Sequence, residues 1–100
     1  MIKWFSKKDV LFLHSKFIAR YGGLNGLRDE GMLESALAAP QQTFGSQDLY
    51  PTAIDKIARL SFGLVMNHPF LDDNKRIGTF VLTLEMAVNE ISFKVLDDDL

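Results

Sequence analysis

Apolar residues recur at helical spacing in four stretches of the chain, and polar, glycine- or proline-containing segments separate these stretches. The first stretch follows Ser6, which has Asp9 three residues further on, as at many helix starts, and it ends at the glycine pair 22–23. The second follows Asp29, a good capping residue, and ends before Pro40. The apolar positions of these two predicted helices are Val10, Phe12, Leu13, Phe17 and Ile18, and then Met32, Leu33, Ala36 and Leu37.

Two longer stretches lie on either side of residues 67–76. Their apolar positions are Ala53, Ile54, Ile57, Ala58, Ser61, Leu64 and Val65 before that segment, and Ile77, Phe80, Val81, Leu84 and Val88 after it. Pro51 is placed for the first turn of the earlier helix, and the small residues on its stripe permit close approach of a neighbour. We therefore expect the two long helices to pack together, with residues 67–76 as the loop between them.

The remaining segments carry weaker patterns. Residues 41–50 have no helical period, contain Gly45 and several polar residues, and are expected to form an exposed loop or flap. Apolar and polar residues alternate over 91–95, which indicates a brief extended segment, and residues 97–99 resemble the start of a further helix. The pattern as a whole predicts an all-α fold.

The composition is that of one small globular domain spanning residues 1–100. It is 47% hydrophobic and 24% charged, unlike a disordered chain. The formal net charge of −2 argues against general nucleic-acid binding, which needs a clustered basic surface. No cysteine is present, which excludes disulfides and thiolate zinc sites. Since no apolar run reaches spanning length and the N-terminus lacks an export signal, we expect a cytoplasmic protein with no membrane association.

Residues 67–76 concentrate the chemically active side chains of the chain. Pro69 interrupts the helical pattern, so Asn74, Lys75 and Arg76 are expected to form the first turn of the next helix. The free N–H groups and positive dipole end of a helix N-terminus bind anions, and the lysine and the arginine add full charges. The segment therefore predicts a phosphate site.

Two further side chains of this segment supply the rest of a reaction site. Asp72 offers oxygen ligands of the kind that magnesium prefers when it is shared with nucleotide phosphates. His68 can accept a proton near neutral pH. A base, a metal ligand and a phosphate cradle together suggest phosphoryl or nucleotidyl transfer. The other histidine, His14, has no such context and is expected at the surface or the edge of the core.

The string His-Pro-Phe-Leu-Asp-Asp-Asn-Lys-Arg at 68–76 resembles the signature of the Fic/Doc family, roughly His-x-Phe-x-Asp/Glu-Gly-Asn-Gly/Lys-Arg. Lys75, where many members have glycine, is similar to the Doc (death on curing) branch. Further Doc-like segments lie at 21–23, 26–29, 33–37, 40–41, 48–51 and 63–65, so the resemblance covers nearly the whole chain. It implies the compact helical bundle of the Fic fold, with an active-site loop between two long central helices and a short flap. Doc-like proteins usually continue into a last helix, so the domain is expected to be shortened at its C-terminus.

The resemblance also implies a role for most residues of the motif. His68 would be the catalytic general base, and Asp72 would hold the Mg²⁺ that bridges the phosphates of ATP. Asn74 would fix the anion-binding turn, and Arg76 would clamp a phosphate with its planar fork. Phe70 would anchor the loop in the core.

Two positions depart from the family pattern. Asp73 stands where Gly or Ala is usual, and a second carboxylate beside a phosphate site either repels the anion or joins the metal shell. Its plain alternative is a loop acid that caps the next helix. We count Asp73 with Asn74, Lys75 and Arg76 as the residues around the nucleotide phosphates. Thr79 replaces an arginine that many AMP-transferring members carry, which again favours the Doc branch.

The resemblance implies a Doc-like toxin of a toxin–antitoxin pair, which transfers phosphate from ATP to a Ser or Thr hydroxyl of elongation factor Tu and so halts translation. The flap at 41–50 would dock the target. Because no inhibitory Ser/Thr-x-x-x-Glu string occurs in the chain, control would come from a separate antitoxin. In Doc-like systems the antitoxin is a segment that folds into a helix on an apolar groove of the toxin. Two alternatives stay open. One is AMP transfer, as in most Fic relatives, and the other is a catalytically degenerate member that only binds its antitoxin.

Overall fold

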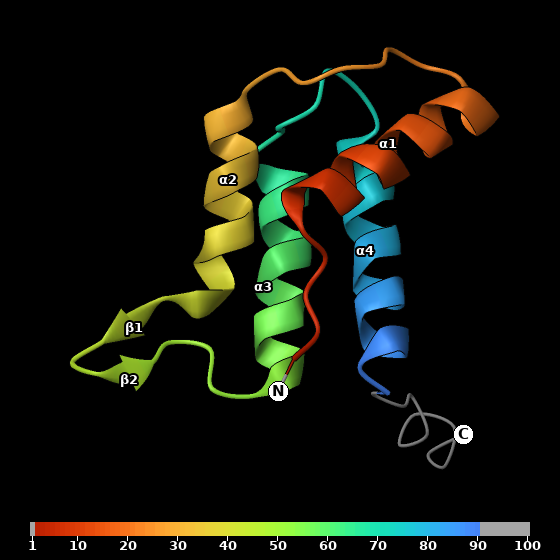
Figure 1. Cartoon of the computed structure of the whole chain (residues 1–100). Coiled ribbons are helices and arrows are strands. Elements are labelled where there is room, and N and C mark those ends of the chain that lie inside the picture. The colour runs from red at the N-terminus through yellow and green to blue at the C-terminus, as the bar shows by residue number, and fades with distance from the viewer. Residues whose placement is uncertain (1, 91–100) are drawn as a thin grey trace.

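The computed structural model describes residues 2–90, which form a helical bundle with one small hairpin (Figure 1). Its elements are α1 (Lys7–Tyr21), α2 (Glu30–Ala38), the 3₁₀ turn η1 (Ala39–Gln41), β1 (Thr43–Phe44), β2 (Gln47–Asp48), α3 (Ala53–Met66) and α4 (Asn74–Val88). The predicted all-α class is confirmed. The extended segment and the further helix expected beyond residue 90 lie outside the described residues. No helix within residues 2–90 is long and apolar enough to cross a membrane.

Local capping signals locate the ends of the first two helices correctly. The Ser6 hydroxyl accepts the Asp9 N–H at 3.1 Å, and the Asp9 carboxylate accepts the Ser6 N–H at 2.9 Å. Helix α1 stops at Gly22, whose φ of 83° suits a residue without a Cβ. Asp29 begins α2 by accepting the Met32 N–H at 3.1 Å.

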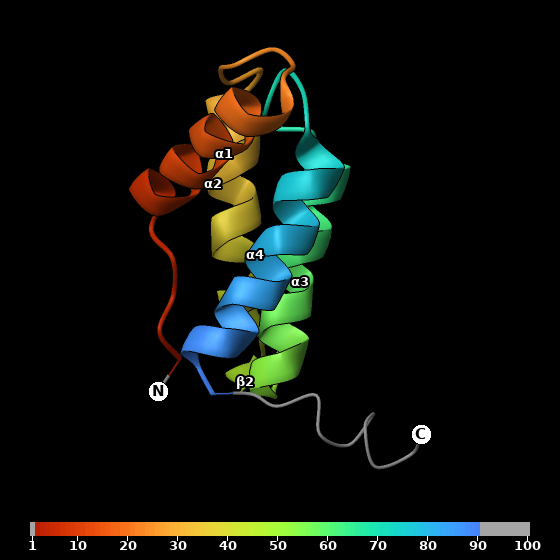
Figure 2. The ribbon, with the colours of Figure 1, turned by 90° about the vertical axis from the view of Figure 1, so that its right-hand side faces the viewer.

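Helices α3 and α4 pack side by side over their whole lengths, as expected, and α1 crosses one end of the pair (Figures 1 and 2). A Cβ on Gly78 would stand 2.5 Å from Val65, so the glycine permits this close packing. The prediction for the start of α3 was wrong by two residues. Thr52 caps the helix by accepting the Asp55 N–H at 3.0 Å, and Pro51 precedes the cap.

The core lies where α1, α2, α3 and α4 meet. Its buried members are Val10, Leu33, Ala36, Leu60, Leu64, Phe70, Ile77 and Val81. Several predicted apolar positions are instead exposed, namely Phe12, Met32, Ile54, Ala58, Phe80 and Val88. In a bundle this small each helix touches its neighbours over a narrow arc, so the edges of an apolar stripe face solvent.

The hairpin and the loop between α3 and α4 lie at opposite ends of α3 (Figures 1 and 2). Residues 41–49 are exposed, as expected of a flap. However, α3 separates the hairpin from the loop by roughly 20 Å at 1.5 Å per residue. The hairpin strands are two residues each and cannot span that distance. The hairpin is therefore too far from the loop to dock a target beside it.

Candidate active site

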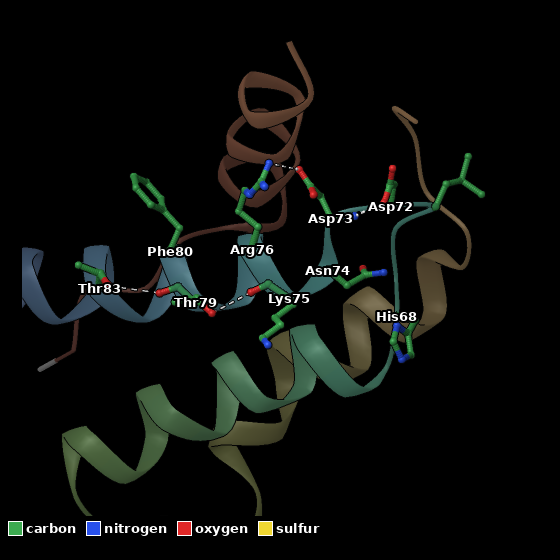
Figure 3. A pocket seen from close by; sticks show the side chains of 10 residues that line it. His68, Asp72, Asp73, Asn74, Lys75, Arg76, Thr79, Phe80 and Thr83 are labelled. Atoms are coloured by element: carbon green, nitrogen blue, oxygen red, sulfur yellow. Dashed lines mark hydrogen bonds and ion pairs between the residues drawn. The ribbon is translucent and has the colours of Figure 1, made fainter. Parts of the chain in front are cut away.

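An open pocket with a volume of about 790 Å³ lies where the loop enters α4 (Figure 3). Its lining residues are His68, Leu71, Asp72, Asp73, Asn74, Lys75, Arg76, Thr79, Phe80 and Thr83. The structure thus brings together every residue that the sequence assigned to the site except Phe70, which lies buried beneath the loop.

The N-terminus of α4 opens into this pocket. Asp73 precedes the helix in the left-handed conformation, with φ 66°, and its side chain makes no capping hydrogen bond. The first backbone bond into the helix is that of the Ile77 N–H with the Asp73 carbonyl, at 3.0 Å. The first-turn amides of Asn74, Lys75 and Arg76 therefore face a pocket rather than a capping side chain, as an anion site requires.

Asp73 pairs with Arg76 instead of capping the helix. The two side chains form an ion pair of 3.3 Å, and the guanidinium also lies over the ring of Tyr21, 4.5 Å from its centre. Figure 3 shows both side chains pointing toward α1, while Lys75 and His68 point to the other side of the first turn. The charge of Arg76 is thus partly compensated by Asp73. The Lys75 ammonium group lies on the side of the first turn where His68 lies.

Asp72 is held firmly by backbone groups. Its Oδ2 accepts the Leu24 N–H at 3.1 Å, and its Oδ1 accepts the Asp73 N–H at 2.9 Å. Gly23 allows this approach, because a Cβ there would lie 2.6 Å from the carboxylate. Within residues 2–90 no three His, Cys, Asp or Glu residues gather as a metal cluster. A single fixed carboxylate fits magnesium that takes its other ligands from phosphates and water.

Phe70 anchors the loop in the hydrophobic core, where its side chain is 1% exposed. The amide side chain of Asn74 accepts the Phe70 N–H at 2.9 Å and donates to the Phe70 carbonyl at 3.0 Å. The backbones of Phe70 and Leu27 form an isolated antiparallel β-bridge, and the Leu71 N–H donates to the Gly26 carbonyl at 3.1 Å. Asn74 therefore acts on the site by fixing the loop backbone.

His68 is exposed at the pocket, in the left-handed backbone conformation with φ 47°. Arg28 supports this unusual geometry, since its guanidinium donates to the carbonyls of His68 and Asn67. The Arg28 N–H also donates to the Pro69 carbonyl at 2.7 Å. No role was predicted for Arg28, because an arginine in a glycine-containing loop carries no local signal of the carbonyls to which it donates.

His14 is the second residue at the site that was not predicted from the sequence. It was expected at the surface or the core edge but is 1% exposed. Its ring stacks on Phe70, with centroids 3.7 Å apart and planes 7° apart. Its Nε2 lies 2.8 Å from the Asp72 carbonyl oxygen. This expectation was wrong because α1 crosses directly over the loop, a contact that no helical period reveals.

Comparison with known proteins shows which family the chain belongs to. Residues 4–86 match the model of the Fic/DOC family. Toxin Doc of Mycolicibacterium smegmatis is 40% identical over 76 residues, which are 76% of this chain and 56% of that protein. No solved structure gives a significant match. The chain belongs to the Fic/DOC family, in its Doc branch, and spans just over half the length of this relative.

Proposed function

We propose that the chain is a Doc-like toxin that transfers the terminal phosphate of ATP to a Ser or Thr hydroxyl of a protein. The observation that carries this proposal is the uncapped N-terminus of α4, which opens into a pocket together with His68 and Asp72. A helix N-terminus of this kind suits phosphate, and a histidine at its edge can take a proton from an incoming hydroxyl.

The reaction then needs positioning and charge stabilisation rather than covalent catalysis. The ring of His68 accepts the proton of the target hydroxyl, whose oxygen forms a bond to the terminal phosphorus. The bond from that phosphorus to the bridging oxygen breaks, and ADP leaves. The first-turn amides of α4 with Lys75 and Arg76 stabilise the charge on the transferring group. Asp72 would hold Mg²⁺, which when bound neutralises charge on the phosphates.

Transfer of AMP is the second candidate, and Lys75 bears on the choice between the two. A glycine at this position lets phosphate approach the backbone closely, whereas the lysine side chain occupies that space. Thr79, which lines the pocket where many AMP-transferring relatives carry an arginine, donates its hydroxyl proton to the Lys75 carbonyl at 2.8 Å. A second phosphate-binding arginine is thus lacking at that place, which favours phosphate transfer.

The proposed target is elongation factor Tu, and the proposed partner is an antitoxin segment that folds into a helix on an apolar groove. The similarity to a protein named as a toxin supports a paired antitoxin. The described surface carries large exposed apolar side chains that such a helix would need, among them Phe12 and Phe80. Binding should raise the melting temperature of the chain by linkage.

The test is incubation of the purified chain and elongation factor Tu with ATP labelled at either the γ- or the α-phosphate. Label from the γ-position is expected on the target, and His68→Ala should reduce its rate by about 10²–10⁴-fold. Thr83→Ala is the matched control, because Thr83 lines the same pocket and bonds only to its own helix. Transfer of α-label would instead support AMP transfer, and equal rates for His68→Ala and wild type would remove the mechanism.

A further inference from the structure

One buried polar group has no part in the chemistry described so far, namely the imidazole of His14. Burial of such a group is costly unless it is hydrogen-bonded, and an apolar residue would fill the same place beside Phe70 without that requirement. The single hydrogen bond that the structure shows for this ring runs from Nε2 to the Asp72 carbonyl oxygen, at 2.8 Å. A carbonyl only accepts, so Nε2 carries the hydrogen here.

This hydrogen bond fixes the peptide group between Asp72 and Asp73. A trans peptide is planar, so its C=O and its N–H point in opposite directions. His14 holds the C=O, and the N–H on the other side, that of Asp73, donates to Asp72 Oδ1 at 2.9 Å. The orientation of this peptide plane, together with the Leu24 N–H that donates to Oδ2, therefore sets the direction of the Asp72 carboxylate.

The same peptide leads directly into the anion site. Asp73 has φ 66°, a conformation that is sparsely populated outside glycine and must be held by its surroundings. The first turn of α4 starts at the next residue. Rotation of the 72–73 peptide would move the Asp72 carboxylate and the first amides of α4 together.

We propose that His14 is a positioning residue of the transfer site, which acts through its Nε2–H on the 72–73 peptide and so places the Asp72 carboxylate beside the α4 amides. The inference rests on the proposed function for its catalytic consequence, although the structural link does not depend on it. The competing explanation is that His14 serves only as a packing partner for Phe70.

The test compares two substitutions of similar length that differ in the hydrogen-bond donor. His14→Gln keeps an N–H at similar reach, whereas His14→Met keeps the volume and loses the donor. For His14→Met we expect the magnesium needed for half-maximal ATP binding to rise about 10-fold or more, with kcat lowered by a similar factor, as for other partners of metal-binding groups. His14→Gln should restore most of this loss. Equal values for His14→Gln and His14→Met would overturn the proposal.

A third variant, His14→Phe, and the measurement of amide exchange at Asp73 distinguish positioning from packing without relying on catalysis. His14→Phe retains the stacked ring, so a mere packing role requires this variant to behave as wild type. We expect faster amide exchange at Asp73, measured by NMR, in His14→Phe and His14→Met but not in His14→Gln. Unchanged exchange in all three would refute the positioning role even if the wild-type chain transfers phosphate. If exchange at Asp73 is faster in His14→Phe and His14→Met while the wild-type chain transfers no phosphate, the proposed function alone is refuted.

Discussion

The substitution Asp73→Asn distinguishes two possible roles of the Asp73 carboxylate. It either lowers the affinity of the proposed site for phosphate or takes part in binding the nucleotide through a metal ion. Asparagine keeps the shape of the side chain and tolerates the left-handed backbone at this position, so the start of α4 should be preserved. The substitution removes the charge that pairs with Arg76 at 3.3 Å. We expect Asp73→Asn to bind ATP more tightly than wild type. The carboxylate opposes phosphate binding in two ways, because it occupies Arg76 and because it repels the phosphate charge.

The expected magnitude follows from the exposure of the pair. The Arg76 side chain is 46% exposed and that of Asp73 is 17% exposed, so the ion pair that a phosphate must displace contributes about 0.2–1 kcal/mol. Direct repulsion between the carboxylate and a phosphate about 4 Å away adds roughly 1 kcal/mol where water screens the charges. Together they correspond to an affinity gain of roughly 5–30-fold.

Isothermal titration calorimetry with ATP, with and without magnesium, measures this gain. Asp55→Asn is the matched control. It makes the same change in net charge, but Asp55 lies in the first turn of α3, at the end of that helix away from the pocket. Affinity that is equal to wild type would refute the role of Asp73 as a competitor for Arg76. Weaker affinity only in the presence of magnesium would show instead that Asp73 joins the metal shell.

Three further substitutions test the supports of the site and the fold. Arg28→Ala should cost about 0.5–1.5 kcal/mol in urea unfolding, because it removes two exposed hydrogen bonds to the carbonyls of His68 and Asn67. It should also slow transfer, and an unchanged rate would show that Arg28 does not position His68. Burial raises the pKa of Glu85, so the folded state binds its proton more tightly than the unfolded state and stability should fall as pH rises above the ordinary range of a glutamate. Urea midpoints across that range should show a smaller pH slope for Glu85→Gln, and identical slopes would contradict the assignment. Gly78→Ala should lower thermal stability by about 1–3 kcal/mol, since its Cβ would meet Val65 at 2.5 Å; an unchanged melting curve would show that α3 and α4 are not so closely packed.

The parts of the fold that depend on neighbouring residues could be predicted from the sequence. Ser6 with Asp9, and Asp29 before α2, act within one helical turn, and the structure confirms them. Phe12 and His14 show the limit of such reasoning. Both lie on α1, yet the phenylalanine is 59% exposed and the histidine is buried, because the crossing of α1 over the loop decides which face is covered.

The candidate site shows the same division. The residues of the motif are close in sequence, so their meeting in one pocket could be anticipated. Their supports come from far along the chain, as with Arg28 bound to the His68 carbonyl and His14 to the Asp72 carbonyl. Contacts of this kind depend on how the helices pack, which the spacing of apolar residues does not specify.

The central claim is that this pocket transfers the terminal phosphate of ATP to a protein hydroxyl with His68 as base. Intact-mass spectrometry of elongation factor Tu after incubation with the chain, ATP and magnesium tests it most directly. The expected result is a phosphate-sized addition that is absent with His68→Ala. An AMP-sized addition, or no addition by the wild-type chain under conditions in which it binds ATP, would contradict the claim.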